Sequence, residues 1–326
     1  MQMKRTLLLA ALAATAATSA FAQSSVTIYG RLNMTFEREK FSGQDAANNL
    51  NNNSSRIGFR GTEDLGGGLS ALFEIEHGFS PDTGTAASTF WGRSSFVGLQ
   101  GGFGKVRLGN MTSEAYYATA DYVSMHNHDT GTSEDKLYDY LSQNTDKISY
   151  KTPSFAGNTI EVAGTTRDGG VGNRTYDVAY NGDFGPLHVG AGYQDVKDGP
   201  SALAVRALYE LGAFTLGGYY QRTMGETAGA PSDSAKRNTF RFAAMYALGA
   251  GEFHANVGWA GDRGGVDNTG AKQYTLGYNH NLSKRTKLYG YYTRLDNESA
   301  ADYFLPATAA DGTDYSSFAF GIRHNF

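Results

Sequence analysis

The sequence predicts an all-β protein, a 16-stranded antiparallel transmembrane β-barrel. Three observations predict this fold class. Segments in which apolar and polar residues alternate recur from the N-terminal region to the last residue. The composition suits strands and tight turns, with 21 Tyr, 19 Phe and 42 Gly against 6 Pro. The chain also begins with an export signal, although its mean hydropathy is negative.

The first 22 residues have the three parts of a secretory signal peptide. Lys4 and Arg5 make a basic start, an apolar stretch follows, and an A-F-A cleavage site ends the segment at residues 20–22. The apolar stretch is shorter than the roughly 20 residues that a membrane-spanning helix needs. We therefore expect a signal peptide at residues 1–22 and a mature barrel domain at residues 23–326. This domain folds without disulfides, because the sequence has no cysteine.

Negative mean hydropathy agrees with a membrane barrel, because only every second side chain of each strand faces lipid. Phe253, Val257 and Trp259, for example, share one face of a segment whose other face carries His254 and Asn256. A soluble sandwich alternates as well, so the number of segments has to decide. We count sixteen, near residues 26–36, 55–60, 69–77, 94–99, 105–109, 147–152, 159–166, 174–181, 187–194, 203–210, 214–222, 238–246, 252–259, 273–280, 286–294 and 317–326. An even number lets the first and last strands pair and leaves no open edge in lipid.

The connections between these segments alternate in length. Turns such as residues 61–68 and 281–285 are short. The long polar connections are residues 37–54, 110–146, 223–237, 260–272 and 295–316. Short turns on the periplasmic rim and long loops on the outer rim are typical of bacterial outer-membrane barrels. No change in composition indicates a second domain.

Six blocks of the sequence carry a family resemblance. They are SSVTIYG at 24–30, SRIGFRGTEDLGGGL at 55–69, FVGL at 96–99 with GFG at 102–104, YKTPSFAG at 150–157, GYNHNLSKRT at 277–286 and GIRHNF at 321–326. Together they resemble the general trimeric porins of betaproteobacteria, including the neisserial type. The resemblance covers essentially all of the mature chain, and RGTEDLGGGL and NLSKRT are its most specific parts.

This resemblance implies a homotrimer in the outer membrane, in contact with its lipid and lipopolysaccharide. It implies a passive, water-filled channel for small hydrophilic solutes and ions, without a cofactor, and a third extracellular loop folded into the pore. It also implies that Phe326 is the end recognised by the barrel-assembly machinery. The alternative interpretation of Phe326 is ordinary strand packing. The mature chain has 26 basic and 32 acidic residues once Lys4 and Arg5 are removed, which argues against nucleic acid as a partner.

The longest connection, residues 110–146, is the candidate constriction loop. Its acidic residues include Glu114, Asp121, Asp129, Glu134, Asp135 and Asp139, against the single base Lys136. Inside a narrow lumen such a loop would set a local field that selects ions by sign. The alternative interpretation is a solvated surface loop whose charges face bulk water.

Strand alternation points basic side chains of the first, second and fifth segments into the lumen. These are Arg31, Arg56, Arg60, Lys105 and Arg107. A charge on the lipid face would cost roughly 2–4 kcal/mol at mid-membrane, which favours the inward orientation. Acidic loop and basic wall would together create a field across the pore.

The resemblance also places basic pore residues at Arg56 and Arg93. Arg93 shares the parity of the outward-facing Val97 and Leu99, so pointing it inward requires a bulge or a position above the membrane rim. Related porins often carry a base where this chain has Gln143. We therefore expect a weakly charge-selective pore, and the sequence leaves its sign open.

Nothing in the sequence favours an enzyme or a specific metal site. His126 and His128, flanked by Asp121 and Asp129, are the one histidine cluster, and no H-E-x-x-H, cysteine site or G-x-S-x-G elbow accompanies them. Spacing alone leaves open a Ser–His arrangement on a barrel rim. The alternatives to a general diffusion channel are thus a solute-specific outer-membrane channel and a barrel enzyme or anchor. Sixteen segments count against the enzyme or anchor, whose barrels are smaller.

Overall fold

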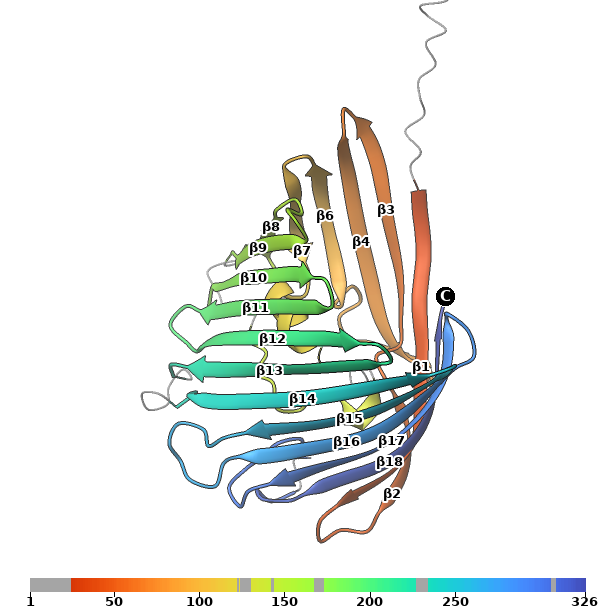
Figure 1. Ribbon diagram of the computed structural model, residues 1–326, viewed down its shortest axis with the longest axis vertical. Helices are drawn as coiled ribbons and strands as arrows, with labels where there is room; N and C mark the ends of the chain where they lie inside the picture. The colour runs from red at the N-terminus through yellow and green to blue at the C-terminus, as the bar shows by residue number, and fades with distance from the viewer. Residues whose placement is uncertain are drawn as a thin grey trace, which may run out of the picture.

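A computed structural model describes residues 25–121, 123, 130–141, 144–166, 173–226, 234–305 and 309–326. In this part of the chain, 18 strands form one antiparallel sheet that closes on itself. β1 (Ser25–Phe41) pairs with β18 (Tyr315–Asn325) on one side and with β2 and β3 on the other. Figure 1 shows β9 to β18 following one another in chain order around the wall. The predicted closed barrel is confirmed.

Each of the sixteen predicted segments corresponds to one strand of this wall. In chain order, after β1, they are β3 (Arg56–Gly66), β4 (Leu69–Ser80), β6 (Ser94–Gly101), β7 (Gly104–Asn110), β8 (Lys147–Lys151), β9 (Asn158–Thr165), β10 (Thr175–Phe184), β11 (Leu187–Val196), β12 (Ser201–Leu211), β13 (Phe214–Met224), β14 (Arg237–Leu248), β15 (Gly251–Ala260), β16 (Ala271–Asn281), β17 (Thr286–Asn297) and β18. Two further strands, β2 (Ala47–Asn52) and β5 (Thr85–Ala86), were not predicted.

The predicted long polar connection at residues 37–54 is mostly strand, which corrects the expected loop. β1 continues through this region to Phe41 and forms a hairpin with β2. β2 and β3 then follow the same edge of β1, separated by a β-bulge at which Ser54 adopts a φ of 59°. They act as one interrupted wall strand, and β5 is a two-residue extension beside β4. The barrel wall therefore has 16 strands.

The two faces of the wall differ as the alternation predicts. On β14, the outward Phe242 is 65% exposed, whereas the inward Arg241 is fully buried. Most of the largest fully buried side chains are polar, including Gln194, Gln221 and Gln273. The interior is therefore a hydrogen-bonded polar lumen, and the apolar surface faces outward.

Outward-facing aromatic rings form two bands near the strand ends. Near the long-loop ends, Phe240 lies between Tyr220 and Trp259, with ring centroids 4.8 and 5.5 Å away. Near the short-turn ends, Phe214 contacts Tyr246 at 4.7 Å and Phe253 contacts Tyr278 at 4.9 Å. Such girdles mark the two membrane interfaces of a transmembrane barrel.

The connections define two rims. Short turns at residues 67–68, 102–103, 152–157, 185–186, 212–213, 249–250 and 282–285 form one rim, called here the short-turn rim. In the first of them Gly66, Gly67 and Gly68 all have positive φ (84, 62 and 79°), which few other residues tolerate. No helix in the described ranges is long and apolar enough to span a membrane.

Candidate functional site

The segment between β7 and β8, called here the inner loop, lies against the lumenal face of the wall (Figure 1). Its described residues are 111–121, 123, 130–141 and 144–146. It contains α2 (Glu114–Tyr116), η1 (Tyr117–Asp121) and η2 (Gly131–Ser133). A Cβ atom at Gly190 or Gly192 of β11 would collide with the backbone of Ala118 or Ala115, so the glycines permit this close approach.

The first tether of the inner loop is Glu114. Its carboxylate lies 3.3 Å from Arg107 Nη2 on β7 and 3.3 Å from Lys151 Nζ on β8. Arg107 also binds Glu161 Oε1 on β9 at 2.5 Å and donates to Ser149 Oγ at 3.2 Å. The acidic start of the loop thus faces a predicted basic wall residue, within a cluster that contains both charges.

The second tether is a buried ion pair between Asp135 and Arg241 of β14. The guanidinium donates from Nε and Nη2 to the two carboxylate oxygens, at 2.8 Å each, and Tyr219 donates to Oδ2 at 2.5 Å. Burial acts to raise the pKa of Asp135, but the Arg241 charge and these hydrogen bonds outweigh it and hold the pKa below its usual value. Asp135 is therefore a fixed anion that anchors the loop.

The third tether is Asp139. It forms an ion pair with Arg237 of β14, and Thr223 Oγ1 donates to its Oδ2 at 2.5 Å. Gln221 bonds both backbone groups of Asp139, accepting from its N–H and donating to its carbonyl, each at 2.8 Å. Arg237 also donates to the carbonyl of Leu137 at 2.9 Å. Two arginines of one strand therefore neutralise two acids of the inner loop.

The far end of the loop is held by hydroxyl groups. Thr132 Oγ1 donates to Glu37 Oε2 of β1 at 2.5 Å, and Ser317 Oγ of β18 donates to the same oxygen at 2.9 Å. The backbone N–H of Thr132 donates to the Tyr291 hydroxyl of β17 at 3.0 Å. The inner loop therefore crosses the lumen from the β7–β9 wall to the β17–β18–β1 wall.

Tyrosines stiffen the inner loop itself. Tyr116 lies 5.8 Å from Tyr138 and 5.2 Å from Tyr140 between ring centroids, and Tyr138 contacts Tyr219 of the wall at 5.4 Å. Burial raises the pKa of Tyr140 to about 12, so this phenol stays neutral at physiological pH. A hollow of about 340 Å³ lies along this cluster and reaches Glu134 and Asp135. The loop surface is thus aromatic as well as acidic.

The basic wall has a second ion-pair cluster around Glu76 of β4. Arg93 Nε lies 2.6 Å from Glu76 Oε1, and Arg56 Nε lies 3.8 Å from the same oxygen. Arg93 precedes β6, which begins at Ser94, and reaches this acid from the connection to β5. Its inward contact therefore needs no bulge within the strand.

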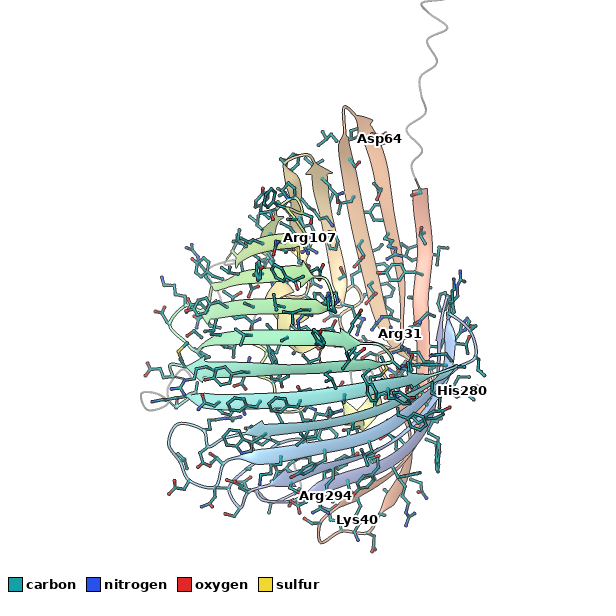
Figure 2. The ribbon with its side chains drawn as sticks, in the orientation of Figure 1. Arg31, Lys40, Asp64, Arg107, His280 and Arg294 are labelled. Carbon is teal, nitrogen blue, oxygen red and sulfur yellow. The ribbon has the colours of Figure 1, made fainter. Side chains whose placement is uncertain are left out.

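The other predicted wall bases, Arg31, Arg60 and Lys105, have the inward parity of β1, β3 and β7 (Figure 2 labels Arg31). Arg31 Nε donates to Asn325 Oδ1 at 2.9 Å, and the Arg60 guanidinium lies over the Tyr29 ring at 4.9 Å. Lys105 pairs across strands with Lys151, the Glu114 partner. Arg60 and Lys105 thus lie in the lumen with no predicted acid of the inner loop within 4.0 Å, among the described residues.

Two of the remaining predicted loop residues lie in the described part of the inner loop, and one lies outside it. Asp121 ends η1, and Glu134 pairs with the neighbouring Lys136. Asp129, His126, His128 and Gln143 lie outside the described residues. Sequence reasoning missed Arg237, Arg241, Glu37 and Glu76 as partners, although each follows the inward parity of its strand. The parity of a strand position gives the direction of its side chain, inward or outward. It cannot show which loop residue pairs with a wall residue some 100 positions away.

The last residue closes the barrel at the short-turn rim. Phe326 exchanges two backbone hydrogen bonds with Gly30, both 3.1 Å, and its ring covers Gly30 on the outer face. This packing leaves both interpretations of Phe326 in place. No group of three or more potential metal-ligating side chains occurs in the described part of the chain.

Comparisons with known proteins agree with this geometry. The family model described as Gram-negative porin matches residues 8–300. The chain is 34% identical to outer membrane porin protein 32 of Delftia acidovorans, over 99% of this chain and 100% of that protein. A solved structure of the anion-selective porin from Comamonas acidovorans superimposes with a TM-score of 0.76 and 28% identity, over 93% of this chain and 100% of the other. The trimer form of OmpT from Vibrio cholerae matches with a TM-score of 0.71 at 17% identity, over 93% and 99% of the two chains, and shows the shared fold.

Proposed function

Because the chain belongs to the Gram-negative porin family and is a porin of the outer membrane, we propose that it is a general diffusion channel. Small hydrophilic solutes and ions would cross through the polar lumen, past the inner loop. One observation carries this proposal. The inner loop is held inside a closed barrel by two arginine–aspartate pairs whose arginines are buried, so it narrows the lumen at a fixed place.

We assign the charged residues of the lumen to the two sides of this constriction. The wall side has Arg31, Arg56, Arg60, Arg93, Lys105 and Arg107, and the loop side has Glu114, Asp121, Asp129, Glu134, Asp135 and Asp139. Ion pairs already compensate Glu114, Asp135 and Asp139. A solute passing the loop therefore meets less negative charge than the sequence suggests.

A weak preference for anions follows from this compensation. Arg60 and Lys105 form no ion pair within 4.0 Å among the described residues. The Arg60 guanidinium instead lies over the ring of Tyr29, at 4.9 Å. Uncompensated cations along a narrow water-filled path raise the local anion concentration. The anion-selective porin that this chain resembles at 28% identity supports the same sign.

The cellular context belongs to the same proposal. Residues 1–22 would be removed as a signal peptide, and residues 23–326 would assemble as a homotrimer, as the trimer form of a structural neighbour suggests. The terminal Phe326 would be read by the barrel-assembly machinery, and the outer face would meet lipid and lipopolysaccharide. We propose no enzymatic activity, in keeping with a family of channels.

Liposome swelling tests the proposal against its alternative, a solute-specific channel. Vesicles with the purified protein would be diluted into isotonic sugars and amino acids of increasing size. A general channel gives swelling rates that fall smoothly with solute size, for chemically different solutes alike. Rapid swelling with one solute class, and slow swelling with others of equal size, would replace the general channel by a specific one.

A further inference from the structure

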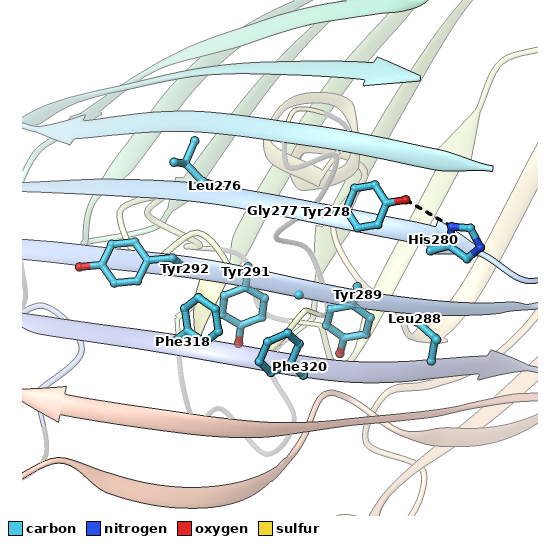
Figure 3. A pocket seen from close by; sticks show the side chains of 11 residues that line it. Leu276, Gly277, Tyr278, His280, Leu288, Tyr289, Tyr291, Tyr292, Phe318 and Phe320 are labelled. Carbon is cyan, nitrogen blue, oxygen red and sulfur yellow. Dashed lines mark hydrogen bonds between the residues drawn. The ribbon is translucent and has the colours of Figure 1, made fainter. Parts of the chain in front are cut away.

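The outer face of β16, β17 and β18 carries an apolar groove of about 570 Å³ (Figure 3). Gly290 on β17 forms its floor, because this outward position has no side chain. Leu276, Leu288, Tyr292, Phe318 and Phe320 make its walls. The groove is therefore a recess in the lipid-facing surface.

A polar cluster lies where the groove meets the short-turn rim. His280 continues the outward row of β16, and its Nδ1 lies 3.3 Å from the Tyr278 hydroxyl (Figure 3). The Nδ1 atom of His324 on β18 likewise lies 2.8 Å from the Thr286 hydroxyl oxygen. When the hydroxyl donates to Nδ1, the Nε2–H of the ring is left to donate outward. Both histidines are exposed.

The turn beside these histidines is basic. Residues 282–285 join β16 to β17 and include Lys284 and Arg285, both exposed. The turns at 67–68, 102–103, 152–157, 185–186, 212–213 and 249–250, all within the described residues, have no charged residue. Within two positions of these turns lie the acids Asp183, Glu210 and Glu252 and the bases Lys105 and Lys151. Positive charge on the turns of this rim is therefore concentrated beside the groove.

We propose that this face binds one anionic phospholipid of the inner leaflet. Along the membrane normal, the apolar groove lies at the depth of the acyl chains and the basic turn lies at the level of the headgroups, as such a lipid requires. An acyl chain would lie over Gly290 and contact Phe320 and Leu288. The phosphate would accept hydrogen bonds from Lys284, Arg285 and the two histidines, since the short turns of bacterial barrels face the periplasm.

Native mass spectrometry of the folded protein tests this site. The protein would be released from mixed micelles that contain either dioleoylphosphatidylglycerol or dioleoylphosphatidylcholine, and bound lipids would be counted. Two variants change the site, Gly290→Leu by filling the groove and Lys284→Gln with Arg285→Gln by removing the charge. Gly218→Leu is the matched control, because Gly218 is also an outward strand glycine beside a phenylalanine of the next strand.

We expect the wild type to retain phosphatidylglycerol in preference to phosphatidylcholine. The charge variant should lose roughly fivefold in phosphatidylglycerol affinity for each base removed, Gly290→Leu should lose retention of both lipids, and Gly218→Leu should behave like the wild type. Equal retention of the two lipids, or an equal loss in Gly218→Leu, would overturn the proposal. The proposal would also be overturned if Gly290→Leu changed the oligomeric mass of the protein and left the number of bound lipids unchanged, because a second copy of the chain would then occupy the groove. Channel conductance should be unchanged in all variants, which separates this site from the pore.

Discussion

Removing the carboxylate of Asp135 should release the inner loop from the wall. The Asp135→Ala substitution leaves the Arg241 guanidinium fully buried, after the loss of two 2.8 Å hydrogen bonds to the carboxylate. Breaking one partner of a buried ion pair costs about 3–5 kcal/mol. Since 1.4 kcal/mol is a factor of ten, the undocked fraction of the loop should rise by roughly two to four orders of magnitude.

Single-channel recording in planar bilayers measures this release. An undocked loop moves within the conducting path, so Asp135→Ala channels should show larger open-channel current noise and subconductance steps. Glu134→Ala is the matched control, because it removes a neighbouring loop acid that is 45% exposed and pairs only with Lys136 among the described residues. A surface pair of this kind contributes about 0–1 kcal/mol.

A double variant separates the buried charge from the lost contact. Asp135→Ala combined with Arg241→Met has no uncompensated buried charge, so its noise should fall back toward the wild-type level. Asp135→Ala channels as quiet as the wild type would refute the view that this pair anchors the loop. A double variant noisier than Asp135→Ala would show that Arg241 acts through other partners.

Three further predictions follow from the lumen and the outer face. The folded pKa of Asp135 lies below its usual value, so its contribution to docking is present above about pH 3.9 and is lost as the pH falls through the folded pKa. The current noise should therefore stay constant from neutral pH to about pH 4 and rise only below pH 4. A rise in noise near pH 5–6 would contradict this assignment. Arg56→Glu should shift the reversal potential in a salt gradient toward cations, because it replaces one lumenal cation beside Glu76 by an anion, and an unchanged potential would remove Arg56 from the constriction. Phe242→Arg should lower the free energy of unfolding in lipid vesicles by about 2–4 kcal/mol, because Phe242 is 65% exposed on the outer face. The control Phe242→Leu should lower it much less. Equal losses in the two variants would mean that this face does not meet lipid.

The wall could be predicted from the sequence because a closed barrel in lipid leaves few choices. Alternation determines the direction of each side chain, and closure requires an even number of strands. The hairpin of β1 and β2 was missed because its residues do not alternate between apolar and polar. Beyond Phe36 the chain reads Glu37, Arg38, Glu39 and Lys40, and β2 is mostly asparagine, so this region lacks the apolar face that marks a strand in the membrane.

The lumenal site could be predicted only in part. Alternation correctly points Arg107 and Arg241 inward, and the length and acidity of residues 110–146 mark a special loop. The pairing of Asp135 with Arg241 joins residues 106 positions apart, and nothing local in either segment encodes it. The sequence therefore overstates the negative charge of the loop, because three of its acids are compensated by wall bases.

The central claim is a water-filled path through a closed barrel, and conductance in planar bilayers tests it most directly. Purified folded protein should insert in discrete steps, each with an ohmic conductance that rises in proportion to the salt concentration. Membranes that stay silent while folded protein is inserted, or a conductance that saturates at low salt, would contradict an open aqueous lumen.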